Sequence, residues 1–428
     1  MIPALPASEG FNYRPSGGGH RLHCEDLALD GLAARFGTPL YVYSRRAIET
    51  SYRAYTKALA THSAQVCYAV KANSNLAVLD VLARLGAGFD IVSEGELARV
   101  LAAGGDARKV VFSGVGKSER EIEAGLTADI ACFNVESAPE LDRIDAAAQR
   151  LGTRARVSLR VNPDINARTH PYISTGLKDN KFGVAYDDAL PLSRLAAQKK
   201  AVELIGIGCH IGSQITEIAP YIEAVDRIID LIENLAREGI NLRHVDIGGG
   251  LGIRYRDENP PPISDLIDAA LSQLDSRGHQ QLTVILEPGR SIVGNAGMLL
   301  TRVEYLKPGE TKNFAIVDAA MNDLIRPALY DAWMDVVPVA PRASDPQRYD
   351  IVGPVCESTD WLARDRALTL QPGDLLAIAS AGAYAMAMSS NYNTRPRPAE
   401  VMVSGSEAYC VRKRETISEL FAGESRLP

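Results

Sequence analysis

The sequence predicts a (β/α)8 barrel followed by an antiparallel β domain, and three observations lead to this fold class. Between residues 66 and 286, short apolar runs alternate with segments of helical periodicity. Polar and glycine-rich residues follow each run, at the strand ends where active sites of such barrels lie. After Arg290, strand-like runs separated by Pro/Gly turns replace the helical patterns. We therefore expect the barrel at residues 36–290 and the β domain at residues 1–35 together with 291–428.

The expected barrel strands are eight apolar runs: Val66–Val70, Phe89–Val92, Val110–Phe112, Ile130–Phe133, Val157–Val161, Leu204–Cys209, His244–Ile247 and Val284–Leu286. Helical patterns fill intervals between them, at Leu76–Leu85, Glu96–Ala103, Glu119–Leu126, Pro139–Leu151 and Tyr221–Glu238. Repeated strand–helix units imply parallel strands with crossover helices. Eight strands fit a closed barrel, although counting alone leaves a doubly wound open sheet as the alternative.

The β domain is expected from runs at Met298–Tyr305, Asn313–Asp318, Arg348–Ile351, Leu375–Ile378, Glu400–Val403 and Tyr409–Arg412. Tyr41–Tyr43 is a further strand that could belong to either part of the chain. The stretch Asn162–Gly183 has the pattern of a long loop, and long loops at the rim of a barrel are often lids.

Composition excludes several classes of protein. The 428 residues are 46% hydrophobic and 23% charged, which is ordinary for globular domains. The net charge of −7 gives no reason to expect nucleic acid or an anionic membrane as a partner. The six cysteines have no metal-ligand spacing, so we expect free thiols in a reducing compartment, with neither zinc nor disulfides. The first ten residues lack a secretory pattern and no segment suits a bilayer, so we expect a soluble, cytoplasmic protein.

Lys71 follows the first barrel strand directly. Burial at a strand end lowers the pKa of a lysine and favours the neutral amine that forms a Schiff base. A salt-bridged lysine is the structural alternative.

The run Gly248–Gly252 fails the spacing of a dinucleotide-binding motif because Ile253 stands where a glycine is required. Three consecutive glycines still allow backbone N–H groups to converge on a small phosphate, with a tight turn as the alternative.

Glu287 ends the eighth strand, where a buried carboxylate needs a cationic or N–H partner. A protonated heterocycle would serve, and an ion pair with Arg290 is the commoner case. His210 could approach a ring closely, because Ile211-Gly212 follows it. A core histidine bonded to a carbonyl is the alternative there.

The second part of the chain adds weaker candidates. Cys356 stands beside Glu357 in a Gly/Pro loop and could donate or accept a proton, although a lone cysteine is more often inert packing. Arg326, Tyr330 and Tyr384 are candidates for binding carboxylate and phosphate groups.

Taken together, these motifs resemble those of the fold-type III pyridoxal phosphate-dependent decarboxylases. The similar segments, in family order, are Tyr68–Asn73, His210–Gln214, Gly248–Gly252, Glu287–Arg290, Cys356–Ser358 and Gly382–Tyr384. Within that family, Thr169–Gly176 and Asn180–Gly183 are similar to the enzymes that decarboxylate meso-2,6-diaminopimelate to L-lysine, the last step of bacterial lysine biosynthesis. The resemblance runs from about residue 36 to residue 410 and implies an alanine racemase-type barrel.

The resemblance also implies roles for the matching residues. Lys71 would bind pyridoxal 5'-phosphate covalently, His210 would stack on its ring, and Glu287 would keep the ring nitrogen protonated. Further cofactor contacts would come from Ser213, Gly249, Gly250, Pro288, Gly289, Arg290 and Tyr384. Substrate would be bound by Arg290, Arg326, Tyr330, Glu357 and Tyr384. Cys356 would be the proton donor, supplied across the interface of a homodimer.

The residue types suit this chemistry. A protonated pyridine delocalises the carbanion left by decarboxylation, and an acid must then return a proton to the carbon. Glu357 suits the distal ammonium of the substrate, and the two arginines suit its distal carboxylate. The rivals are decarboxylases of ornithine, arginine or carboxynorspermidine, and a non-catalytic pyridoxal phosphate-binding protein, which would generally lack the β domain.

Overall fold

The computed structural model describes residues 5, 10–165 and 180–428. The chain divides into two compact units. The barrel unit comprises residues 51–253 and 259–291, and the β unit comprises residues 1–50, 254–258 and 292–428. The first boundary falls inside helix α2 (Arg45–Ala58). The short segment 254–258 belongs to the β unit, although the residues on both sides of it in the sequence belong to the barrel unit.

The barrel unit is a closed ring of eight parallel strands. They are β5 (Ala64–Ala69), β6 (Gly88–Ile91), β7 (Val110–Phe112), β8 (Cys132–Val135), β9 (Ala155–Asn162), β11 (Val202–Gly208), β12 (His244–Asp246) and β13 (Thr283–Leu286). Neighbours in sequence pair throughout, and β13 pairs with β5 to close the ring. The predicted barrel is confirmed and the open sheet is excluded. A two-residue strand, β10 (Val184–Ala185), pairs with β9.

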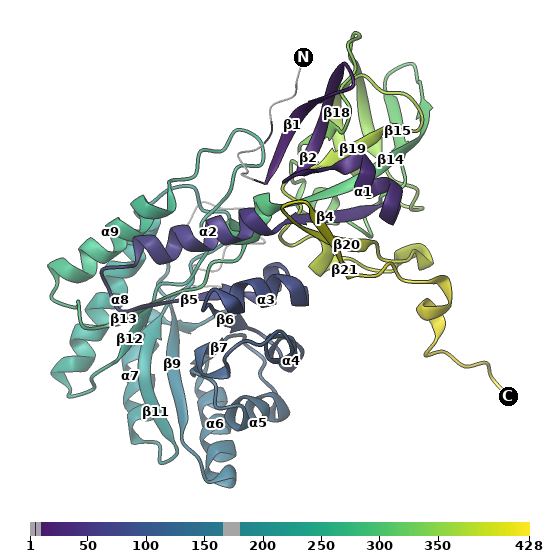
Figure 1. The fold of residues 1–428 in the computed structure, drawn as a ribbon. Helices are drawn as coiled ribbons and strands as arrows, with labels where there is room; N and C mark the ends of the chain where they lie inside the picture. The colour runs from purple at the N-terminus through teal and green to yellow at the C-terminus, as the bar shows by residue number, and fades with distance from the viewer. Residues whose placement is uncertain (1–4, 6–9, 166–179) are drawn as a thin grey trace. The chain divides into compact units, whose positions relative to one another are not determined.

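Helices surround these strands within the barrel unit (Figure 1). They are α3 (Leu76–Arg84), α4 (Glu94–Ala102), α5 (Glu119–Thr127), α6 (Ala138–Leu151), α7 (Tyr186–Gln198), α8 (Ala219–Arg237) and α9 (Ile263–Ser276). The sequence patterns missed α7 and α9. Local signals set several ends: Ser118 and Glu121 form a capping box at α5, and Gly152 in the left-handed region ends α6. Among the described residues, no helix is long and apolar enough to cross a bilayer.

The β unit contains two sheets. The small antiparallel sheet consists of β1 (Phe11–Ser16), β2 (Gly19–Cys24) and β3 (Leu27–Ala28). The larger sheet consists of β4 (Leu40–Ser44), β14 (Gly297–Lys307), β15 (Asn313–Val317), β16 (Val336–Pro338), β17 (Gln347–Val352), β18 (Trp361–Leu368), β19 (Leu375–Ile378), β20 (Ala399–Ser404) and β21 (Glu407–Arg412). Two short helices are α1 (Leu29–Phe36) and α11 (Arg326–Tyr330).

The larger sheet is mixed rather than wholly antiparallel. The pairs β15–β17 and β4–β20 are parallel, while the other pairs are antiparallel. The cause lies in the connections, because a long segment containing α11 and β16 joins β15 to β17 and permits a parallel return. The expected strand at Tyr41–Tyr43 is β4, which pairs with β14 and β20 and so belongs to the β unit.

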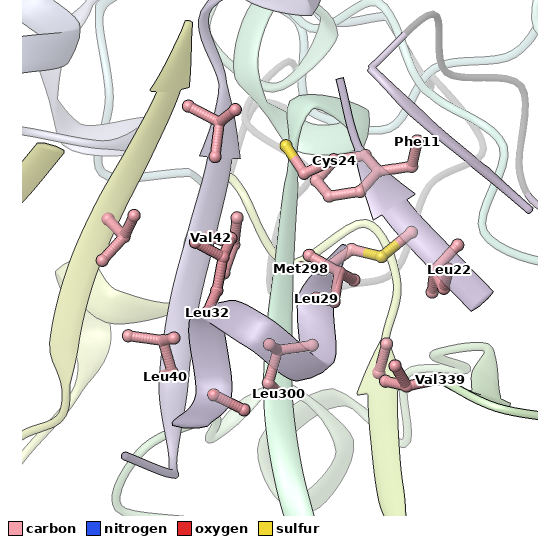
Figure 2. Packing of buried hydrophobic residues seen from close by; sticks show 14 of the residues in the cluster. Phe11, Leu22, Cys24, Leu29, Leu32, Leu40, Val42, Met298, Leu300 and Val339 are labelled. Atoms are coloured by element: carbon pink, nitrogen blue, oxygen red, sulfur yellow. The ribbon is translucent and has the colours of Figure 1, made fainter. Parts of the chain in front are cut away.

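The core of the β unit forms where α1 and β2 pack against β4 and β14. Leu40 and Val42 of β4 meet Met298 and Leu300 of β14, and Leu29 of α1 lies against them (Figure 2). All of these side chains are buried. Burying a side chain of this kind contributes about 1.5–3 kcal/mol, so this layer stabilises the unit that carries Arg326 and Cys356.

Two glycines of β11 leave room for polar side chains of the neighbouring strand β12. A Cβ atom at Gly206 would overlap the ring of His244, and one at Gly208 would lie 2.5 Å from the Cβ of Asp246. Gly206 pairs with His244 and Gly208 pairs with Asp246 in the strand register. The two glycines of β11 thus leave space for the side chains of His244 and Asp246 on the neighbouring strand β12.

Candidate active site

Lys71 lies just past the end of β5, in the short 3-10 helix Val70–Ala72. Its Nζ atom is 2.7 Å from Oδ2 of Asp90 on β6. The Asp90 side chain is fully buried, and that of Lys71 is 36% exposed. The salt-bridged lysine considered in the sequence analysis is therefore present. The ion pair also holds the amine at the carboxyl end of the barrel, where a ligand could reach it.

Glu287 lies at the end of β13 beside two residues from neighbouring parts of the barrel. Asn134 Nδ2 donates to Glu287 Oε1 at 3.1 Å and lies 3.5 Å from Asp246 Oδ2. The Gly248 N–H donates to Asp246 Oδ1 at 2.8 Å. All three side chains belong to buried residues. The amide therefore holds two acidic side chains together at the rim.

Burial perturbs both acids. It is the main cause that raises the pKa of Asp246 to about 6. Burial, then the charges of Asp246 and Asp90, raise the pKa of Glu287 well above its usual range. The positive charge of Lys71 opposes this rise in the pKa of Glu287. A pair of buried carboxyls in contact retains a proton, because two ionised groups there would repel.

This acidic cluster fits a ligand with a protonated ring nitrogen. Asp90, Asp246 and Glu287 supply three buried carboxyl groups, and a cation near them would offset their desolvation. In addition, Asp90 Oδ1 is buried without a hydrogen-bond partner among the described residues. These hydrogen-bond acceptors thus suit a pyridine ring that carries a proton.

His210, just past β11, is neutral. Burial is the main cause that holds its pKa well below the usual value, and the charges of Arg160 and Lys71 add to the effect. The Gly249 N–H donates to His210 Nδ1 at 3.2 Å, so that nitrogen carries no proton. The ring helps to line a cavity with Asn134, Ser158, Arg160, Asp246 and Glu287. A neutral ring at this place can contact an aromatic ligand without adding charge.

The glycine-rich segment after β12 packs tightly against backbone. A Cβ at Gly249 would overlap the carbonyl oxygen of Glu287, and one at Gly250 would overlap that of Gly212. Gly250 also has a φ of 103°, which disfavours any side chain. The Tyr221 hydroxyl donates a hydrogen bond to the Gly249 carbonyl oxygen at 3.0 Å. The tight turn considered as the alternative in the sequence analysis is therefore present.

Two further segments complete this rim. Arg290 donates to Ser213 Oγ at 3.0 Å, which joins two of the expected cofactor contacts. The Pro288 carbonyl accepts the Ala69 N–H at 3.0 Å, next to the segment that carries Lys71. At Gly289, a Cβ would lie 3.0 Å from the Cβ of Ala72. The barrel unit thus places Ser213 beside Arg290, and Pro288 and Gly289 beside the segment that carries Lys71.

The β unit carries the remaining expected residues. Arg326 is buried at the start of α11, and its guanidinium carbon lies 5.0 Å from the ring centre of Tyr255 and 5.6 Å from that of Tyr330. Tyr384 is partly buried and has a φ of 52°. A left-handed tyrosine is uncommon, and such strain is concentrated at functional sites.

Cys356 and Glu357 lie on an exposed loop of the β unit. The Cys356 N–H donates to Asn393 Oδ1 at 2.8 Å, and the Tyr392 hydroxyl lies 3.5 Å from Glu357 Oε2. Cys356 and Glu357 of one loop thus contact Asn393 and Tyr392 of another. The Cys356 thiol is exposed and forms no disulfide.

Sequence reasoning missed two residues of the acidic cluster, Asp90 and Asp246, and assigned no role to Asn134. A signal was available, because Asp90 and Asp246 interrupt apolar runs assigned to buried strands. Charged residues are almost never buried unless they are paired. The Thr169–Gly176 motif and most of the expected lid lie outside the described residues. At the lid's far end, the Gly183 N–H donates to Glu136 Oε2 at 2.9 Å.

Known proteins similar to this chain share both its barrel and its full length. Residues 45–294 match the family described as pyridoxal-dependent decarboxylase, pyridoxal binding domain. The chain is 60% identical to the diaminopimelate decarboxylase of Pseudomonas aeruginosa, over 98% of this chain and 99% of that protein. The diaminopimelate decarboxylase structure of M. jannaschii has a TM-score of 0.93 and 38% identity, covering 98% and 99% of the chains. That of Helicobacter pylori, in complex with L-lysine, has a TM-score of 0.89 and 43% identity, covering 92% and 98%. Identity of this extent over nearly complete chains means that the protein belongs to the family of diaminopimelate decarboxylases.

Proposed function

We propose that this protein decarboxylates meso-2,6-diaminopimelate to L-lysine and CO2, with pyridoxal 5'-phosphate as cofactor, as the last step of lysine biosynthesis. The observation that carries the proposal is the paired buried acids Asp246 and Glu287 on the same rim as the Lys71 amine. Family membership supports it.

The barrel residues have distinct tasks in this proposal. When bound, pyridoxal phosphate supplies an electron sink for the carbanion that loss of CO2 leaves. Lys71 would hold the cofactor covalently. Glu287, which shares the Asn134 amide with Asp246, would hold a proton at the ring nitrogen. His210 would pack on the ring, and its neutral state would leave the charge of the ring unchanged.

The phosphate is held by backbone N–H groups and by the residues around them. Gly249 and Gly250 form the glycine-rich turn beside the phosphate, and Ser213 adds a hydroxyl. Pro288, Gly289 and Arg290 form the adjacent turn. Tyr384 of the β unit contributes its hydroxyl.

The substrate is recognised by charge. Arg290 and Arg326 bind its distal carboxylate, with Tyr330 beside Arg326, and Glu357 binds its distal ammonium. Cys356 returns a proton to the carbon after CO2 has left. An exposed, unpaired thiol supports this assignment.

The working unit is a homodimer in the cytoplasm, with Cys356 supplied by one protomer to the site of the other. Six unpaired cysteines agree with a reducing compartment. Mixing the Lys71→Ala and Cys356→Ala proteins tests the sharing of sites. In a mixed dimer one site carries both defects and the other carries neither, so an equal mixture regains about a quarter of wild-type activity. Sites that lie within one protomer would regain none.

The substrate assignment is tested by comparing kcat/KM for meso-diaminopimelate with kcat/KM for ornithine, arginine, lysine and carboxynorspermidine. We expect strong preference for meso-diaminopimelate, because it places both an ammonium and a carboxylate at the distal end. Comparable values for ornithine would contradict this assignment and leave the decarboxylase class intact. A cofactor-loaded protein that releases no CO2 from any of them would indicate the non-catalytic alternative.

A further inference from the structure

The segment 254–258 meets the residues around Arg326 through two contacts between arginines and aromatic rings. Tyr255 lies under the guanidinium of Arg326, with 5.0 Å between the ring centre and the guanidinium carbon. Arg256, the next residue, lies over the ring of Trp333 at 4.2 Å. In the first contact the segment supplies the ring, and in the second it supplies the cation. The segment is thus held in register against residues 326–333.

The backbone of this segment is held as well. Glu258 Oε2 accepts the N–H groups of Tyr255 and Arg256 at 2.9 and 2.8 Å. Within the barrel unit, the Gln214 side chain bonds both the N–H and the carbonyl of Ile253, at 3.1 and 2.6 Å. Glu258 therefore holds the backbone of Tyr255, whose side chain is 4% exposed.

We propose that Tyr255 is a positioning and specificity-determining residue, whose ring holds the Arg326 guanidinium in place for the distal carboxylate of the substrate. This inference rests on the proposed substrate role of Arg326. Arg326 is itself 7% exposed, so its charge is largely removed from water. The face of an aromatic ring attracts such a cation most strongly when it is desolvated. Tyr330 lies at 5.6 Å, so Arg326 has aromatic rings from two separate segments around it.

The ring limits where the guanidinium can point. Its planar fork binds a carboxylate through two parallel hydrogen bonds only when the plane is oriented correctly. Contact with the Tyr255 ring would restrain the guanidinium before the substrate arrives, which would reduce the entropy lost on binding. Removal of the ring should therefore weaken binding of meso-diaminopimelate and leave the chemical step largely unchanged.

The test compares Tyr255→Phe, which keeps the ring, with Tyr255→Leu, which keeps an apolar side chain without it. Steady-state kinetics of the cofactor-loaded enzyme should show KM within about threefold of wild type for Tyr255→Phe. For Tyr255→Leu we expect a roughly ten- to thirtyfold rise in KM, with kcat and the visible absorbance of the bound cofactor little changed. Tyr349→Leu is the matched control, because Tyr349 is a buried tyrosine of the same unit, outside the binding machinery.

A series of fluorinated phenylalanines at position 255 separates the ring's electrostatics from its packing. Each fluorine weakens the negative face while the ring keeps nearly the same size. We expect KM to rise stepwise with the number of fluorines, whereas a purely structural role would leave KM flat. This series also settles the matter if Tyr255→Leu fails to fold.

The outcomes also distinguish this inference from the function on which it rests. If Arg326→Met raises KM but neither Tyr255→Leu nor the fluorinated series does, the role of Tyr255 is refuted and the substrate site stands. If Arg326→Met leaves KM unchanged, the substrate role of Arg326 fails and the inference fails with it. Loss of bound cofactor in Tyr255→Leu, with a flat fluorinated series, would also overturn the inference, since the residue would then act through the glycine-rich segment.

Discussion

Lys71 Nζ lies 2.7 Å from Oδ2 of the fully buried Asp90. This ion pair holds the Lys71 amine at the rim of the barrel. It therefore favours Lys71 as the single site of covalent attachment for the cofactor.

We therefore expect Lys71→Ala to abolish turnover. Reduction of the cofactor-loaded wild type with borohydride, followed by peptide mapping, should place the label on Lys71. The variant should carry no label. A label on Lys178 or Lys181 would show that the assignment of the site is wrong.

Glu287→Gln should lower kcat by roughly 10- to 100-fold, because the substitution removes a charge-assisted hydrogen bond at the ring nitrogen. The visible spectrum of the bound cofactor should change with it. Glu400→Gln is a suitable control, since Glu400 is a buried glutamate of the β unit that accepts the Tyr43 hydroxyl at 2.7 Å. An unchanged kcat, under conditions in which chemistry limits the rate, would contradict the role of Glu287.

Arg326→Met should lower kcat/KM for meso-diaminopimelate with little effect on cofactor binding. Loss of one partner of a buried charge pair costs about 3–5 kcal/mol, or on the order of 10²–10⁴ in kcat/KM. The ratio of kcat/KM for meso-diaminopimelate to kcat/KM for ornithine should fall accordingly. The control is Arg366→Met, because Arg366 is buried in the same unit but is stacked on Trp333. Equal losses in both variants would indicate a general structural effect.

His244 should make the protein less stable in acid. Burial lowers its pKa from 6.5 to about 4, so between these values the unfolded chain binds a proton that the folded chain does not. The free energy of unfolding contributed by His244 therefore rises with pH over this window, by about 3 kcal/mol in total, and is lost as pH falls through it.

The measurement is urea unfolding of wild type and His244→Gln between pH 4 and 7. Asp246 contributes the opposite slope, because its folded pKa of about 6 exceeds the unfolded value of 3.8 and its contribution falls as pH rises. The difference between the two proteins is therefore the quantity to compare. A pH-independent difference would show that His244 does not titrate in this way.

Gly206→Ala should also destabilise the fold, since its Cβ would overlap the His244 ring.

The repeated strand–helix pattern and the polar residues that follow its strands could be predicted from the sequence alone, whereas closure of the strands into a barrel required the pairing of β13 with β5. Eight short apolar runs separated by helical patterns can bury their strands only as a sheet covered by helices, and the reactive residues follow those runs directly. Lys71, His210, Gly249 and Glu287 could thus be located from local order along the chain, and the joint motif set identified the family. Helix ends such as Ser118 were also readable, because a cap depends on neighbours within one turn.

Tertiary structure alone decided the features that depend on distant segments. Strand β4 pairs in parallel with β20, hundreds of residues later, and no local pattern specifies that partner. The acids Asp90 and Asp246 looked like interruptions of apolar strands until folding brought them beside Lys71 and Glu287. Tyr255 stacks on Arg326 although the segment 254–258 is flanked on both sides by the barrel unit. The physical reason is common to all three cases: burial and electrostatic partners are set by distance in space, and the spacing of residues along the chain does not encode that distance.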